Sequence, residues 1–135
     1  MQVNREYVKA QRALIEKARD SGDEQQMANC LYDLGMYFEG CCMYPLATCI
    51  LGEASQLFKR LIPNHERTRL SVVSLASVHA KRGKIFEAEK LYEELLSSRC
   101  RELGWKDHHD AHEGCDQGNM AAVYIVRNKC VVRFQ

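Results

Sequence analysis

One stretch predicts a pair of helices joined by a tight turn: Leu75-Ala-Ser-Val-His-Ala-Lys-Arg-Gly-Lys-Ile-Phe-Glu-Ala-Glu-Lys-Leu-Tyr-Glu-Glu-Leu-Leu96. The first helix is expected to stop at Arg82-Gly83, because glycine readily adopts the positive φ that closes many helices. The second helix places six apolar residues on one stripe at helical spacing, namely Ile85, Ala88, Leu91, Tyr92, Leu95 and Leu96. A hairpin of this size cannot bury its own apolar stripe, so it requires neighbours of the same kind.

The same pattern occurs once upstream and once downstream of this hairpin. The upstream copy lies 41 residues earlier and consists of Leu34-Gly35, Phe38, Cys42, Ala47, Leu51 and Ala54. The downstream copy lies 45 residues later and consists of Met120-Ala121, Tyr124 and Asn128. Each copy has a large apolar residue, a small one, and an aromatic-type residue three positions on. The chain therefore predicts helical hairpins stacked on one another.

The repeated pattern resembles the tetratricopeptide signature L-G-x2-Y…A-x3-F. The period exceeds the usual 34 residues, and Arg101-Glu-Leu-Gly-Trp-Lys-Asp-His-His-Asp-Ala111 resembles the linker of kinesin-light-chain-type repeats. The sequence departs from the family pattern at three positions: Cys42 replaces the turn glycine, His79 replaces the aromatic residue, and Arg133 replaces an alanine. The resemblance implies an all-α fold, a right-handed α-solenoid of antiparallel helix hairpins with about six helices.

We expect residues 1–135 to form a single domain with an N-terminal helix, two complete repeats and part of a third. The predicted segments are 4–20 for the helix, 27–62 for repeat one, 68–104 for repeat two and 115–135 for the partial repeat three. The N-terminal helix is predicted to bury a stripe made of Tyr7, Val8, Gln11, Leu14, Ile15 and Ala18. Because the chain stops about halfway through a repeat, we interpret it as cut from a longer array, or shortened, or covered at that end by a partner or a second copy.

Composition excludes several classes of protein. Hydrophobic residues make up 46% of the 135 residues, which is ample for a core, yet no run of about 18 apolar residues predicts a membrane span. A net charge of +1 provides no electrostatic case for binding nucleic acid. The seven cysteines are an odd number, which favours reduced thiols and a cytoplasmic protein. Cys41 and Cys42 adjoin in a predicted turn, where a thiol pair is favoured over a disulfide.

A cluster of histidine and cysteine suggests a metal or thiol site, which we treat as a weaker alternative. His108, His112 and Cys115 have the spacing that brings side chains together on a helix, and imidazole with thiolate suits zinc. The linker resemblance accounts for His108 without a metal, and zinc sites usually draw ligand pairs from two separate segments. No Walker loop, G-x-G-x-x-G, G-x-S-x-G or H-E-x-x-H motif occurs. We therefore expect no enzyme and no cofactor.

The first helix of each stacked hairpin is expected to line a concave groove that binds another protein. The predicted groove residues are Asn29, Tyr32, Met36 and Glu39 in repeat one; Leu70, Val73, Ser77 and Lys81 in repeat two; and Asn119 and Ala122 in repeat three. Amides there would bond the backbone of a peptide or helix, and apolar pockets would select its side chains. This predicts a non-catalytic scaffold or adaptor. The alternative is an assembly subunit that homodimerises or docks through its open C-terminal edge.

Overall fold

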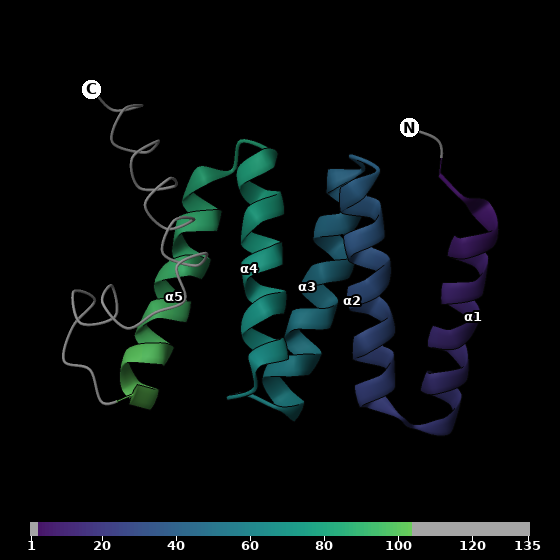
Figure 1. The fold of residues 1–135 in the computed structure, drawn as a ribbon, viewed down its shortest axis with the longest axis horizontal. Coiled ribbons are helices and arrows are strands. Elements are labelled where there is room, and N and C mark those ends of the chain that lie inside the picture. The colour runs from purple at the N-terminus through teal and green to yellow at the C-terminus, as the bar shows by residue number, and fades with distance from the viewer. Residues whose placement is uncertain (1–2, 104–135) are drawn as a thin grey trace.

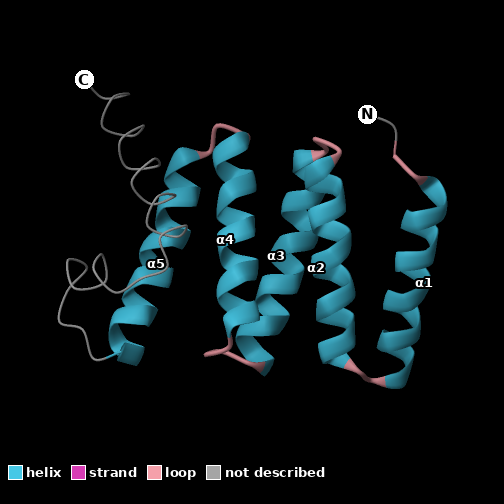
Figure 2. Cartoon of the chain, viewed as in Figure 1, coloured by secondary structure: helices cyan, strands magenta, loops and turns pink. Residues whose placement is uncertain are grey.

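The computed structural model describes residues 3–103, and these form α-helices joined by short turns (Figures 1 and 2). The helices in this part of the chain are α1 (Arg5–Ser21), α2 (Glu24–Gly40), α3 (Tyr44–Leu61), α4 (Glu66–Lys81) and α5 (Ile85–Leu103). Successive helices are antiparallel and stand in a row in chain order (Figure 1). The described residues contain no strand, so the all-α prediction is confirmed. The right-handed sense stays a prediction, and the sixth helix, expected within 115–135, lies outside the described residues.

Local chemistry sets where the helices begin and end. The Asn4 side chain accepts a hydrogen bond from the Tyr7 backbone N–H, and Asp23 does the same for Gln26, so each caps a helix start. Because Asp23 supplies this cap, α2 begins at Glu24, three residues before the predicted Met27.

Two equivalent turns use the left-handed region of backbone conformation. Gly83 follows α4 with φ of 81°, as the sequence predicted. Cys42 lies in the turn between α2 and α3 with φ of 61°, a conformation that non-glycine residues rarely adopt. The alignment of Cys42 with Gly83 is therefore confirmed, because both residues close the same type of turn.

The core is continuous from α1 to α4, and a tight contact within it joins α2 to α3. The buried residues that form the main apolar cluster are Ile15, Ala28, Cys30, Leu31, Leu34, Phe38, Ala47, Leu51, Ala54, Phe58, Leu75 and Val78. Gly35 faces Leu51 directly, since a Cβ at Gly35 would lie 2.7 Å from Leu51 Cγ. The small residue of the repeat pattern thus allows the two helices to come together.

The hairpin of α4 and α5 buries the stripe that the sequence predicted. Ile85, Ala88, Tyr92, Leu95 and Leu96 are buried, and Leu91 is half-buried. On α4, His79 occupies the aromatic position of the pattern and is half-buried, with no hydrogen-bond partner for Nδ1. Burial lowers the pKa of His79, and the cations Lys84 and Arg82 add to this effect while Glu87 opposes it.

The predicted stripe on α1 is wrong in one respect. Ile15 and Ala18 are buried, and the Tyr7 ring packs on the Tyr37 ring of α2 with centroids 4.5 Å apart. Leu14, however, is 43% exposed. Within residues 3–103, α1 packs chiefly against α2, and a single neighbouring helix covers a narrower stripe than the sequence pattern suggested. None of the described helices is both long and apolar enough to cross a bilayer.

Candidate functional site

The predicted groove residues of repeats one and two occupy matching positions on α2 and α4. The first three residues of each set have the spacing i, i+3, i+7, which places side chains on one face of a helix. The fourth residues differ by one position, since Glu39 is i+10 and Lys81 is i+11. Helices α2 and α4 run in the same direction and contact each other (Figure 1). We call the surface they share the α2–α4 face, made of Asn29, Tyr32, Met36, Glu39, Leu70, Val73, Ser77 and Lys81.

Polar residues of the α2–α4 face bind across the contact between the two helices. Arg67 Nη1 donates a hydrogen bond of 2.9 Å to Asn29 Oδ1. One turn further along α2, the hydroxyl oxygens of Tyr32 and Ser74 lie 3.3 Å apart. These contacts fix the position of α4 relative to α2 and leave part of the Asn29 amide available to a ligand.

The last contact in this row is an ion pair. Lys81 Nζ donates to Glu39 Oε1, and the two side chains are 44% and 19% exposed. The hydrogen bond to the Glu39 carboxylate is the main reason that the pKa of Lys81 is raised. The ammonium group also lies 5.9 Å from the centroid of the Tyr44 ring, within the range of a cation–π contact. The acid and the base of the predicted groove therefore neutralise each other.

Apolar side chains of the α2–α4 face remain open. Leu70 is 49% exposed. Met36 and Val73 are half-buried, as is Ser77. The face thus combines polar groups that already pair with one another and apolar groups that do not.

The sequence did not identify Arg67 and Ser74 as part of this contact. The repeats align at a shift of 41 residues, which makes Tyr32 equivalent to Val73. The contacts Tyr32–Ser74 and Glu39–Lys81 each join residues 42 apart instead. These two contacts are displaced by one position from the alignment, and the Arg67–Asn29 contact, between residues 38 apart, is displaced by three in the other direction.

Several predicted residues lie outside the described residues. Asn119 and Ala122 belong to the predicted third repeat, and His108, His112 and Cys115 belong to the possible zinc or thiol site. Among the side chains that the structure describes, residues 3–97, no three of His, Cys, Asp or Glu are grouped in a way that could hold a metal ion. The cysteines of known placement, Cys30, Cys41, Cys42 and Cys49, carry free thiols.

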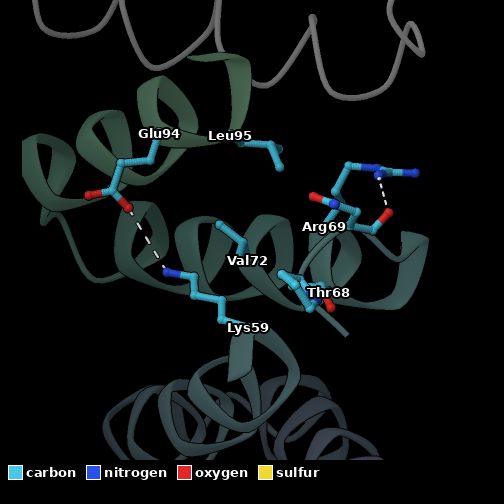
Figure 3. A pocket seen from close by; sticks show the side chains of 8 residues that line it. Lys59, Thr68, Arg69, Val72, Glu94 and Leu95 are labelled. Atoms are coloured by element: carbon cyan, nitrogen blue, oxygen red, sulfur yellow. Dashed lines mark hydrogen bonds and ion pairs between the residues drawn. The ribbon is translucent and has the colours of Figure 1, made fainter. Parts of the chain in front are cut away.

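A pocket lies where α3, α4 and α5 meet, and it has a volume of about 320 Å³ (Figure 3). Its charged rim is already paired, since Lys59 Nζ lies 4.0 Å from Glu94 Oε2 and Arg69 donates to the Asn64 carbonyl at 3.1 Å. The Thr68 hydroxyl donates to the Ile62 carbonyl at 2.6 Å, so it stabilises the turn before α4. This pocket therefore contains no nucleophile and base arranged for catalysis.

Antiparallel helices stacked in chain order, with equivalent turns at Cys42 and Gly83, define a helical-repeat protein. The family model of the tetratricopeptide repeat matches residues 71–110, and this segment is a tetratricopeptide repeat of the kinesin-light-chain type. No curated protein matches the chain. A tetratricopeptide repeat implies a module for protein–protein interaction and is typically non-catalytic.

Proposed function

We propose that the α2–α4 face binds a peptide or helix of a partner protein, in a scaffold or adaptor role. The single observation that supports this most strongly is that the Leu70 side chain is exposed on the same face as the half-buried side chains of Met36 and Val73. Burying a leucine side chain completely contributes about 1.5–3 kcal/mol. An apolar side chain of the partner would bury Leu70, and the free hydrogen-bonding capacity of Asn29 and Ser77 would bind the partner's backbone.

The pairs across α2 and α4 support the proposal in a second way. Arg67–Asn29, Tyr32–Ser74 and Lys81–Glu39 order side chains before any ligand arrives. A face that is already ordered loses less conformational entropy on binding. Because Lys81 pairs with Glu39, its ammonium group is not free to bind a terminal carboxylate, and we expect no tight binding of acidic chaperone tails.

A pull-down with matched variants tests this function. Leu70→Asp introduces a charge at the open apolar position, and Phe86→Asp makes the same kind of change on α5, where Phe86 is 57% exposed. Proteins that require the α2–α4 face should be recovered by the wild type and by Phe86→Asp and should be lost with Leu70→Asp. Equal recovery by all three chains would show that this face is not the binding surface.

The alternative role, assembly through the C-terminal edge, involves residues 115–135. Light scattering over a range of protein concentrations distinguishes the two roles. A monomer at all concentrations supports a module that binds other proteins, whereas a stable dimer that Leu70→Asp leaves intact supports assembly through another surface. The cytoplasmic location stays a prediction.

A further inference from the structure

A hollow at the start of α1 differs in charge from the pocket in Figure 3. It has a volume of about 460 Å³, within the range of ligand-binding pockets. We call it the α1 hollow; its lining residues are Val3, Arg5, Val8, Lys9, Arg12, Phe38, Met43 and Leu46. They come from α1 and the residues just before it, from the end of α2, and from the start of α3 with the turn that leads into it. Figure 1 shows the start of α1 at the same end of the molecule as the turn between α2 and α3. None of them belongs to the α2–α4 face.

The floor of the α1 hollow is apolar and its rim is basic. Phe38 is buried, Val8 and Leu46 are half-buried, and Met43 is 38% exposed. Arg5, Lys9 and Arg12 are all exposed, and no acidic residue lines the hollow. Among residues 3–97, none of these three cations forms an ion pair or a side-chain hydrogen bond, whereas Lys59 at the other pocket is paired with Glu94.

The three cations are arranged in a line along α1. Their spacing is i, i+4, i+7, so Lys9 and Arg12 lie about 6 and about 10.5 Å from Arg5 along the helix axis. A neighbouring helix with acidic residues at the same spacing would place one carboxylate opposite each cation. An extended chain would match less closely at the third cation, because its residues on one face recur about every 6.6 Å, at about 6.6 and about 13 Å.

We propose that the α1 hollow binds an amphipathic helix of a partner protein that has an acidic stripe beside an apolar one. The acidic stripe pairs with Arg5, Lys9 and Arg12. The apolar stripe covers Met43 and the half-buried side chains of the floor, in the manner of helix-in-groove recognition. Charge complementarity of this kind selects the partner and makes its association dependent on salt. This site is separate from the α2–α4 face and would allow one chain to bind two partner segments.

The test uses a synthetic helical peptide of about 18 residues as the probe. The peptide has glutamate at positions i, i+4 and i+7 next to a leucine stripe, and a second peptide has glutamine in place of each glutamate. Fluorescence anisotropy with the full chain should show binding of the acidic peptide that weakens as salt is raised. The glutamine peptide should bind more weakly, by a factor of about ten or more. Equal affinity for the two peptides, or no binding of either, would overturn the proposal.

Charge reversals on the protein localise the binding. Lys9→Glu/Arg12→Glu should weaken binding of the acidic peptide about tenfold or more. The control Lys17→Glu/Lys90→Glu changes the net charge equally at exposed positions outside the hollow, and it should keep the affinity within about twofold. Circular dichroism checks that both variants keep the helical content of the wild type.

Two further measurements distinguish helix binding at the α1 hollow from a general attraction between charges and from binding to a membrane. Leu70→Asp should bind the acidic peptide normally, so the proposal can hold even if the α2–α4 face binds nothing. If the control variant also loses the affinity, the interaction is a general charge effect and the proposal fails. It also fails if vesicles containing phosphatidylserine bind in a way that requires Lys9 and Arg12 while the acidic peptide does not bind.

Discussion

Gly35 of α2 and Leu51 of α3 are in such close contact that the space between them holds no additional carbon atom. A Cβ at Gly35 would lie 2.7 Å from Leu51 Cγ and 3.3 Å from the Leu51 backbone nitrogen. Leu51 is completely buried, so a shift of its side chain would disturb the residues packed around it. The contact therefore determines how closely the two helices of the first hairpin approach.

We predict that Gly35→Ala destabilises the chain, by up to about 2.5 kcal/mol. Overpacking a core costs about 1–3 kcal/mol, which exceeds the gain of about 0.5–1 kcal/mol from replacing glycine by alanine within a helix. Gly52→Ala is the matched control, because a Cβ at Gly52 of α3 would meet nothing within 4 Å. Urea denaturation should show Gly52→Ala to be more stable than the wild type. If Gly35→Ala and Gly52→Ala stabilised the chain equally, the close contact between Gly35 and Leu51 would be contradicted.

We predict that Cys42→Gly stabilises the chain by about 1 kcal/mol. The left-handed conformation costs a residue with a Cβ roughly 1–2 kcal/mol, and glycine adopts it without this cost. The substitution loses only a weak contact, because the Tyr44 hydroxyl lies 3.6 Å from Cys42 Sγ. Cys41 has an ordinary φ of −87°, so Cys41→Gly should not stabilise. Thermal unfolding of the two variants measures the difference, and the reverse order would contradict the assigned turn.

We predict that His79 makes the chain less stable in mild acid. Burial lowers the pKa of His79 in the folded state, so the unfolded chain binds the proton more readily. Stability from this residue is complete above the unfolded value of about 6.5 and is lost as pH falls from there through the lower folded pKa. His79→Phe should reduce the change in the urea midpoint between about pH 7.5 and about pH 5.5. An unchanged difference would show that another group is responsible.

We predict a modest, salt-dependent coupling between Glu39 and Lys81. Partly exposed ion pairs contribute about 0.2–1 kcal/mol, and these two side chains are 19% and 44% exposed. A double-mutant cycle with Glu39→Gln and Lys81→Met measures the coupling, which should decrease in high salt. The pair Glu16–Arg19 on α1 is more exposed, at 64% and 54%, and should show a smaller coupling. A larger value for that pair would be inconsistent with the ordered contact between α2 and α4.

Features that depend on neighbouring residues in the chain could be predicted from the sequence. The turn at Gly83 depends on one residue's backbone freedom, and the buried stripe of α5 depends on helical spacing alone. The turn at Cys42 followed from alignment with Gly83, because equivalent positions in repeats have equivalent backbones. Each of these inferences required only local geometry and the repeat.

Features that depend on how separate helices meet could not be predicted in this way. The contact of Tyr32 with Ser74 depends on the rotation of one hairpin against the next, which the repeat alignment does not contain. Leu14 is exposed because, within residues 3–103, α1 packs chiefly against α2 alone. How many helices cover α1 depends on the tertiary structure and not on the spacing of its apolar residues. The helical spacing of Arg5, Lys9 and Arg12 can be read from the sequence. The apolar floor of the α1 hollow includes Phe38 of α2, which only the fold brings close to these cations.

Photo-cross-linking tests the central claim, binding at the α2–α4 face, most directly. A photoreactive amino acid is placed at position 70 in one chain and at position 86 in another, and both positions are exposed in the wild type. Mass spectrometry then identifies the cross-linked peptides from a cell lysate. The account predicts that position 70 captures a defined segment of a partner protein and that position 86 does not capture that segment. Capture of the same segment with equal yield from both positions, or from position 86 alone, would contradict it.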